Sequence, residues 1–149
     1  MKAVVYTDGG ARGNPGPAAI GVVLQIEGRD PVHIGDAIGA ATNNVAEYRA
    51  LLRALQEAKK LGVTELECRL DSELVVKQLN HEYKVRDRDL GSLFIRVWNL
   101  AQGFRAIRFV AVPRSENREA DRLVNTTLSK AGHPKKPAPY RARASRLDR

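Results

Sequence analysis

The sequence predicts an α/β protein in which helices pack on the faces of a mixed β-sheet, with its elements in the order βββαβααβα. Three observations predict this fold. Residues 2–7 (KAVVYT) form a short apolar run rich in β-branched residues, which is typical of a central strand covered on both faces. Residues 44–61 carry apolar side chains at helical spacing. Residues 65–70 (ELECRL) alternate apolar and polar side chains, as a strand does.

The first half of the chain is predicted to form an antiparallel meander that leads into the long helix. The first strand is expected to end at Asp8, where the stretch GGARGNPGP turns the chain into a second strand over residues 18–26. The sequence EGRD turns the chain again, into a third strand over residues 31–40. The helix over residues 44–61 follows, and Gly62 fits its C-cap.

The second half alternates helices and strands. The strand over residues 65–70 is expected to end at Asp71 and to bury Cys68 as a small core residue rather than a reactive thiol. Beyond it the sequence predicts helices over residues 72–79 and 90–102, a last strand over residues 106–112 and a closing helix over residues 116–130.

Composition describes one globular domain followed by a basic tail. The chain has 149 residues, of which 43% are hydrophobic and 28% charged, and this suits a single domain with a buried core, which we assign to residues 1–131. Residues 132–149 carry six basic residues, one acid and three prolines. This tail is expected to be disordered, either as a solubilising segment or as a source of attraction for phosphate.

The charge of the whole chain indicates a polyanionic partner. Its 25 Lys and Arg residues against 17 Asp and Glu residues give a formal net charge of +8 at pH 7, which is typical of proteins that bind nucleic acid. No apolar run approaches the length of a membrane span, and no charged and then apolar leader begins at Met1. We therefore expect a cytoplasmic location, no membrane partner and a monomer.

Four carboxylates are candidates for one cleft. Asp8 and Asp71 follow strands, and ligand sites form at the carboxyl ends of strands in open α/β sheets. Glu47 and Asp121 lie at the borders of the inward stripes of their helices. Two carboxylates about 4 Å apart repel by about 4 kcal/mol at an effective dielectric near 20, so a converged group must take up protons or bind a cation. Oxygen ligands without histidine or cysteine favour Mg²⁺ or Mn²⁺ over Zn²⁺.

Each carboxylate also has a local explanation. Asp8 could start the glycine-rich turn, and Asp71 could cap the helix that follows it. Asn44 and Glu47 have the spacing of a capping box. Asp121 could pair with the arginine three residues before it. These local explanations would be insufficient if all four acids converged, because a converged group needs one common explanation.

Four stretches of the sequence together resemble the acidic motifs of type 1 ribonuclease H. They are YTDGGARGNPGPAAIG, TNNVAEYRALLRAL, LDSELVVKQL and VPRSENREADRLVN, and they occur in the family's order and spacing between Lys2 and about Leu128. The resemblance implies the family's ribonuclease H-like fold, a five-stranded mixed sheet flanked by helices, whose first three strands are antiparallel. The element order predicted from the residues agrees with that fold.

The resemblance implies an activity, which is endonucleolytic hydrolysis of the RNA strand of RNA/DNA hybrids to give 5′-phosphate and 3′-hydroxyl ends. Asp8, Glu47, Asp71 and Asp121 match the family's four catalytic, metal-binding carboxylates, which hold two Mg²⁺ or Mn²⁺ ions across the scissile phosphate. One ion would generate and orient a hydroxide nucleophile, and the other would stabilise the leaving 3′ oxygen.

The resemblance also implies a set of substrate contacts. A protein distinguishes RNA from DNA through the 2′-hydroxyls, which the wide minor groove presents. Thr42 matches a residue that helps to seat a phosphate of the DNA strand, and Glu73 stands where a groove-contacting glutamine is common. The other matching positions are Gly9, Gly10, Asn14, Asn43 and Asn44.

Two features of the family are missing from this sequence. Relatives carry a histidine in a loop about ten residues before the last acid, and Ala111 stands at that position. Arg114, Arg118 or His133 could replace it electrostatically. The basic protrusion that many relatives insert after the third motif is also absent. Affinity for the hybrid is then expected to come from the tail and from Lys77, Lys84, Arg86 and Arg88.

Two other functions stay open on the sequence. The same fold could serve as a non-catalytic module that binds hybrids or double-stranded RNA, although binding alone would not require four acids near a phosphate. A junction resolvase or transposase could also share the fold. Such proteins need dimerisation surfaces or further DNA-binding domains, for which 149 residues leave little room.

Overall fold

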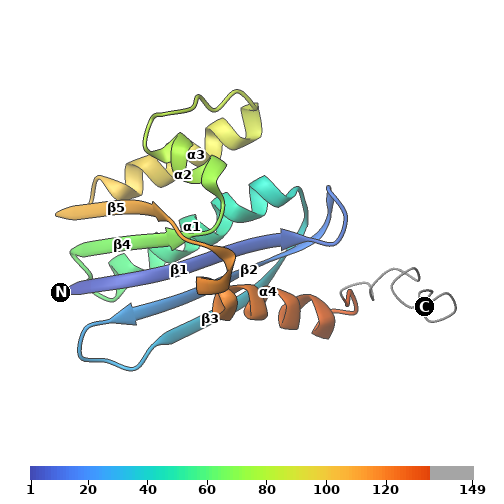
Figure 1. Cartoon of the computed structure of the whole chain (residues 1–149), viewed down its shortest axis with the longest axis horizontal. Coiled ribbons are helices and arrows are strands. Elements are labelled where there is room, and N and C mark those ends of the chain that lie inside the picture. The colour runs from blue at the N-terminus through green and yellow to red at the C-terminus, as the bar shows by residue number, and fades with distance from the viewer. Residues whose placement is uncertain (135–149) are drawn as a thin grey trace, which may run out of the picture.

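The computed structural model describes residues 1–134 and places five strands in one mixed sheet, in the order β3-β2-β1-β4-β5 (Figure 1). The strands are β1 (Lys2–Ala11), β2 (Gly16–Ile26), β3 (Val32–Ala41), β4 (Glu65–Leu70) and β5 (Ala106–Ala111). The helices are α1 (Asn43–Lys60), α2 (Glu73–Leu79), α3 (Arg88–Ala101) and α4 (Arg118–Lys130), with a short 3₁₀ helix, η1 (Arg114–Glu116), before α4. The predicted α/β fold is confirmed.

Strand β1 lies at the centre of the sheet and is longer than predicted. It pairs in parallel with β4 only as far as Thr7, which lies opposite Leu70. Antiparallel pairing with β2 continues to Ala11. The prediction that β1 ends at Asp8 was therefore wrong, because β2 supplies hydrogen-bonding partners for the rest of the strand. Asp8 is the first residue of β1 that lies beyond the end of β4.

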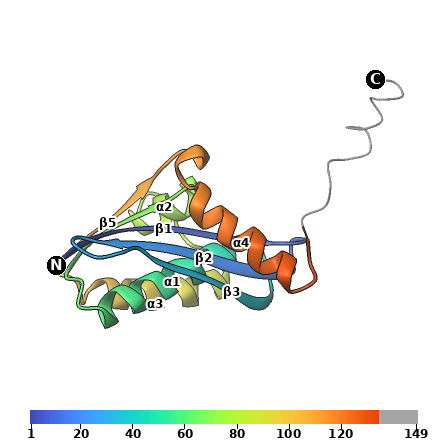
Figure 2. The same ribbon diagram turned by 90° about the horizontal axis from the view of Figure 1, so that it is seen from below.

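Helices cover both faces of the sheet, with α1 and α3 on one face and α4 on the other (Figure 2). The apolar stripe of α1 includes the fully buried Leu51 and Leu55, which belong to the same core cluster as Val5 of β1. Val124 of α4 packs with Ala19 of β2 on the other side. Each large aliphatic side chain buried in this way contributes about 1.5–3 kcal/mol, so both helices are anchored by burial.

Capping explains where the helices begin and end. The hydroxyl oxygen of Thr42 accepts a hydrogen bond from the Val45 amide (3.2 Å) and caps α1. Ser72 caps α2 in the same way, so the local explanation of the preceding aspartate as the cap of this helix was wrong. Gly62 follows α1 with a φ of 86°, which confirms its predicted role at the helix end. The helix predicted over residues 116–130 is divided between η1 and α4.

Three further predictions concern Cys68, membrane spans and the C-terminal tail. Cys68 is fully buried, as predicted. None of the helices in residues 1–134 has the length and apolar character that crossing a membrane requires. Most of the tail predicted over residues 132–149 lies outside the described residues, so the domain boundary at residue 131 stays a prediction.

Candidate active site

Three carboxylates meet where the parallel part of the sheet ends. Asp8 follows Thr7 in β1 and Asp71 follows Leu70 in β4, so the register of these strands brings both acids to the same edge. Glu47 comes from the first turns of α1. One carboxylate oxygen of each acid lies within 4.8 Å of those of the other two. The sequence leads us to expect this arrangement.

Glu47 reaches the other acids because α1 comes very close to β1 at Gly9. A Cβ atom on Gly9 would lie 2.2 Å from the carbonyl carbon of Ala46 and 2.5 Å from the amide nitrogen of Glu47, which leaves no room for a side chain. The Gly9 amide donates a hydrogen bond to Glu47 Oε1 (3.1 Å). Because Thr42 caps α1, the capping-box explanation of Glu47 was wrong.

A second close approach brings Asp121 to the group. Gly21 of β2 lies opposite Asp8, and a Cβ atom on Gly21 would lie 2.2 Å from the carbonyl oxygen of Ala120 in α4. The glycine thus lets the first turn of α4 lie directly against the sheet. Asp121 lines the same cavity as Asp8 and Glu47, with a volume of about 440 Å³.

Two polar contacts that were not predicted from the sequence hold α4 at the site. Asn117, which is 1% exposed, donates from Nδ2 to the carbonyl oxygen of Thr7 (2.8 Å) and fixes the start of α4 against β1. Asn125 donates to Asp121 Oδ2 (3.2 Å) and accepts from Arg12 Nη2 (2.8 Å). The i, i+4 spacing of Asp121 and Asn125 could have indicated their contact. No sequence pattern indicates the link to Arg12.

The site opposes the ionisation of Asp8 and Glu47. Burial, followed by the charges of Asp71 and Asp121, raises the pKa of Asp8 from 3.8 to about 8. Burial and the charges of Asp8 and Asp71 raise the pKa of Glu47 well above its usual value. Arg114, whose Nε lies 3.6 Å from Asp71 Oδ2, acts in the opposite direction on both. Without a cation, Asp8 and Glu47 therefore favour their protonated forms at neutral pH.

These side chains fit a hard divalent cation. The converging ligand atoms of Asp8, Glu47 and Asp71 are all carboxylate oxygens, the donors that Mg²⁺ and Mn²⁺ prefer. The raised pKa of Asp8 reflects repulsion and desolvation that a bound cation would relieve. Asp121 lines the same cavity and can add a further oxygen ligand.

Without metal, the carboxylates should make the protein less stable as the pH rises. The folded protein keeps a proton on Asp8 that the unfolded chain releases above about pH 4, so the stability contributed by Asp8 is full below that pH and is lost as the pH rises through about 8. The slope for one group is at most about 1.4 kcal/mol per pH unit. We expect the Tm of the wild type in chelator to fall relative to that of Asp8→Asn over this range.

Thermal unfolding followed by circular dichroism, in chelator and at several pH values, checks this expectation. The difference in Tm should grow in favour of Asp8→Asn as the pH rises, because asparagine cannot ionise. Adding Mg²⁺ at the highest pH should stabilise the wild type more than the variant. Parallel curves for the two proteins would contradict the raised pKa.

Most of the residues expected to contact substrate lie around the acids. Gly9, Gly10 and Asn43 line the acid cavity. Asn14 Oδ1 accepts a hydrogen bond from the Asn43 amide (2.9 Å), and Asn43 Oδ1 accepts one from the Ala11 amide (3.0 Å), so the loop after β1 and the start of α1 are joined. The hydroxyl of Thr42 and the side-chain amides of Asn43 and Asn44 thus gather at one helix end, where Thr42 is the cap and Asn44 follows in the first turn.

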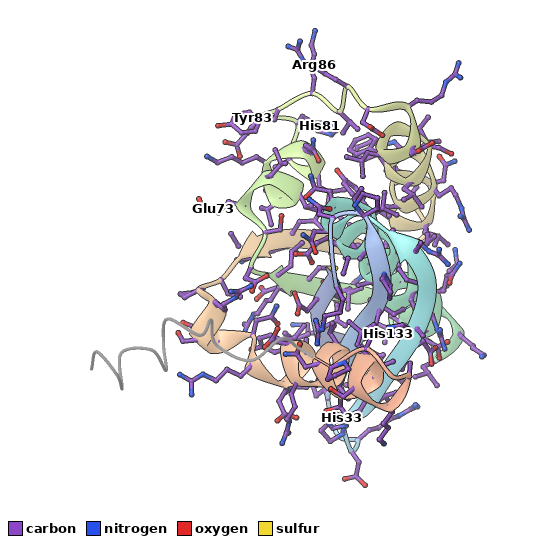
Figure 3. The ribbon with its side chains drawn as sticks, turned by 90° about the vertical axis from the view of Figure 1, so that its right-hand side faces the viewer. His33, Glu73, His81, Tyr83, Arg86 and His133 are labelled. Carbon is purple, nitrogen blue, oxygen red and sulfur yellow. The ribbon has the colours of Figure 1, made fainter. Side chains whose placement is uncertain are left out.

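Glu73 and the candidates for the missing histidine are spread more widely. Glu73 is an exposed residue at the start of α2, and His133 lies beyond the end of α4 (Figure 3). Arg118 lines a separate cavity of about 300 Å³ with Tyr6. Of the three candidates, Arg114 lines the acid cavity. The i, i+3 ion pair of α4 joins Glu119 to Arg122, so the explanation of Asp121 as the partner of Arg118 was wrong.

Comparison with known sequences identifies relatives over most of the chain. A family model described as "Reverse transcriptase-like" matches residues 6–127. A ribonuclease HI of Halobacterium salinarum is 45% identical over 127 residues, which are 85% of this chain and 64% of that protein. The bifunctional protein Rv2228c of Mycobacterium tuberculosis is 47% identical over 133 residues, which are 88% of this chain and 36% of that protein. The chain thus spans about a third of the length of these mycobacterial relatives.

Solved structures with the same fold include three at similar identity. Ribonuclease H1 of Halobacterium salinarum matches with a TM-score of 0.84 and 44% identity, over 87% of this chain and 99% of that one. The N-terminal ribonuclease H domain of Rv2228c matches with a TM-score of 0.81 and 46% identity, over 85% and 98% of the two chains. LC11-RNase H1, solved in complex with an RNA/DNA hybrid, matches with a TM-score of 0.81 and 43% identity, over 87% and 98%.

A mixed five-stranded sheet with carboxylates gathered beside its central strand defines the nucleases of the ribonuclease H fold, and this protein has both features. More narrowly, the chain belongs to the type 1 ribonuclease H family, which confirms the resemblance seen in its four motifs. Members of this family are metal-dependent nucleases, and the carboxylate cluster is consistent with that requirement.

Proposed function

We propose that this protein is an endoribonuclease that hydrolyses the RNA strand of RNA/DNA hybrids and leaves 5′-phosphate and 3′-hydroxyl ends. The observation that carries the proposal is the group of converging carboxylates in a member of this family. The hybrid in the structure of LC11-RNase H1, which is 43% identical to this chain, supports the choice of substrate. A module that only binds nucleic acid would gain nothing from acids placed beside a phosphate.

The four acids Asp8, Glu47, Asp71 and Asp121 would hold two divalent ions, Mg²⁺ or Mn²⁺. When bound, the metal supplies a nucleophile at neutral pH and stabilises the charge that develops on the phosphate and the leaving oxygen. The chain's own part is to hold oxygen ligands from β1, β4 and two helices at fixed spacing before substrate arrives. Rigid elements do this better than loops, because the ligands then need no reorganisation.

Two asparagines have hydrogen-bond donors available for the minor groove. The Oδ1 atoms of Asn14 and Asn43 each accept a backbone hydrogen bond, which orients both side chains. Within residues 1–134, neither Nδ2 group has a hydrogen-bond partner, so both can donate to 2′-hydroxyls or base edges. We assign these two side chains, with the backbone of Gly9 and Gly10, to recognition of the RNA strand. Thr42 is assigned to a phosphate of the DNA strand, and Glu73 is assigned to a contact with the groove of the hybrid.

Arg114 is the side chain that we assign to the role of the missing loop histidine. Its side chain is 83% exposed and lies 3.6 Å from Asp71, so the guanidinium can turn toward a bound phosphate without leaving the site. A guanidinium stabilises phosphate charge but cannot accept a proton. Any proton transfer must therefore pass through water or the carboxylates. Arg118 is not assigned a part, because it lines a different cavity.

Affinity for the hybrid is assigned to basic side chains of α2, the start of α3 and the connection between these helices. His81, Tyr83 and Arg86 lie in this connection (Figure 3). The ammonium of Lys77 lies 5.1 Å from the centre of the Tyr83 ring, which holds both side chains at the surface. Lys84 lies in the connection and Arg88 begins α3, and the basic tail beyond residue 134 lies outside the described residues. The monomeric state, the cytoplasmic location and any action on double-stranded RNA stay predictions.

Incubation with three labelled duplexes tests the proposed function. An RNA/DNA hybrid, an RNA duplex and a DNA duplex are each incubated with Mg²⁺, Mn²⁺ or chelator. We expect cleavage of the RNA strand of the hybrid with metal, no cleavage in chelator and an intact DNA duplex throughout. Binding of the hybrid without cleavage in either metal would favour the non-catalytic module. Cleavage of an added four-way DNA junction would favour a resolvase.

A further inference from the structure

A second polar cleft lies between β3, α1 and α3 and has no part in the site described above. It has a volume of about 330 Å³, and its walls carry Arg49 and Arg53 of α1, Arg96 of α3 and Asp36 of β3. Three arginines from two helices therefore line one hollow that contains a single acid. Guanidinium groups present paired donors that match the oxygens of phosphate and carboxylate groups.

The charges of this arginine cleft are only partly neutralised within the protein. Arg53 Nη1 donates to Asp36 Oδ2 (2.6 Å), and Arg53 Nε lies 3.3 Å from Glu57 Oε2, so this arginine is held in place by two acids. Arg49 and Arg96 are exposed, and neither has an ion-pair partner among residues 1–134. Two guanidinium groups thus remain available to an anion, beside the ion pair of Arg53 and Asp36.

The arginine cleft lies close to the candidate active site but opens elsewhere. Arg49 follows Glu47 by two residues on α1, which turns its side chain by about 200° to the other side of the helix. It lies six residues, or about 9 Å along the axis, from Asn43 at the helix start. Each strand of a duplex carries one phosphate per about 3.4 Å of axis, so a duplex that runs along α1 from Asn43 would present further phosphates over this distance.

We propose that the arginine cleft binds the phosphate backbone of the nucleic acid duplex, away from the scissile bond, through Arg49 and Arg96. The proposal rests on the proposed function for the identity of the duplex. An acidic protein segment could meet the same guanidinium groups, but the position on the helix that carries Asn43 and Glu47 and the net charge of +8 favour a nucleic acid. The cleft would then supply part of the affinity that relatives obtain from their basic protrusion.

The test compares two double variants that lose the same charge. Arg49→Gln/Arg96→Gln removes the two available guanidinium groups. Arg105→Gln/Arg108→Gln is the matched control, because these arginines pair with Glu65 and Glu67 at the β5 edge of the sheet. Binding of a labelled RNA/DNA hybrid is measured by fluorescence anisotropy in chelator from about 50 to about 200 mM salt. Circular dichroism melting curves verify that both variants are folded.

The arginine-cleft variant should bind the hybrid about tenfold more weakly, and its slope of log K against log salt should decrease by about 2 units. The control should keep both quantities near the wild-type values. An unchanged slope would overturn the proposal and leave an acidic protein segment as the occupant. An equal decrease in the control would overturn it in favour of net charge alone. Failure of the wild type to cleave hybrid in Mg²⁺ would count against the proposed function, while the binding result would still decide the occupant of the cleft.

Discussion

Asp8→Asn is expected to abolish metal-dependent cleavage of an RNA/DNA hybrid while the fold stays intact. Asp8 converges with Glu47 and Asp71, and it lines the same cavity as Asp121. Asparagine keeps the shape and one oxygen but loses the charge that binds a cation. Metal ions stabilise such transition states by several kcal/mol, and each 1.36 kcal/mol is tenfold in rate, so the rate should fall by at least about a thousandfold.

Single-turnover cleavage of labelled hybrid in Mg²⁺ measures this loss, and Asp30→Asn provides the matched control. Asp30 is an exposed acid in the turn between β2 and β3, so its replacement removes the same charge far from the carboxylates. The control should cleave at the wild-type rate. Circular dichroism should show that Asp8→Asn is folded and, in chelator above about pH 7, more stable than the wild type. Substantial hydrolysis by Asp8→Asn would remove the basis of the proposed function.

The elements of the fold could be predicted because their signals are local. The period of α1, the alternation in β4 and the apolar run in β1 each reflect burial of one face or of both. The boundaries were less accurate where the decisive partner is distant in sequence. Strand β1 continues past Asp8 because β2 pairs with it as far as Ala11, and no local pattern in the glycine-rich stretch indicates that pairing.

Three of the four acids could be predicted to converge, because the sequence places Asp8 and Asp71 at the end of the parallel strands and Glu47 at the inner border of a helix. The contacts that hold these acids in place could not be predicted. Glu47 is placed by a hydrogen bond from the Gly9 amide rather than by a capping box, since Thr42 takes the capping role. Asn117 fixes the start of α4 through the carbonyl oxygen of Thr7, a contact across 110 residues. Such contacts depend on the packed sheet, which sequence spacing does not describe.

Two glycines determine how closely the helices approach Asp8 from opposite faces. Gly9 admits α1, and Gly21, opposite Asp8 in β2, admits α4. In the sequence Gly9 is part of a turn-like run, and Gly21 stands alone inside an apolar strand, where glycine normally weakens the strand. The structure gives both a single physical reason, which is that neither neighbouring helix leaves space for a Cβ atom.

Gly21→Ala should therefore lower both stability and activity. The new Cβ atom would lie 2.2 Å from the carbonyl oxygen of Ala120, so α4 must move away from the sheet. Overpacking of this kind costs about 1–3 kcal/mol of unfolding free energy. The shift would also move Asp121 away from Asp8, and a displacement of about 1 Å at a catalytic site can cost about a hundredfold in rate.

Gly91→Ala separates this effect from a general sensitivity to alanine. Gly91 lies inside α3 and a Cβ atom there would meet nothing within 4 Å, so the substitution should stabilise the protein by up to about 1 kcal/mol through helix propensity and leave cleavage unchanged. Urea unfolding and single-turnover cleavage are measured for both variants. If Gly21→Ala were destabilised yet cleaved at the wild-type rate, the position of α4 would not control the site. Loss of both properties in Gly21→Ala alone ties the geometry of the carboxylates to Gly21, where Ala120 of α4 lies directly against β2.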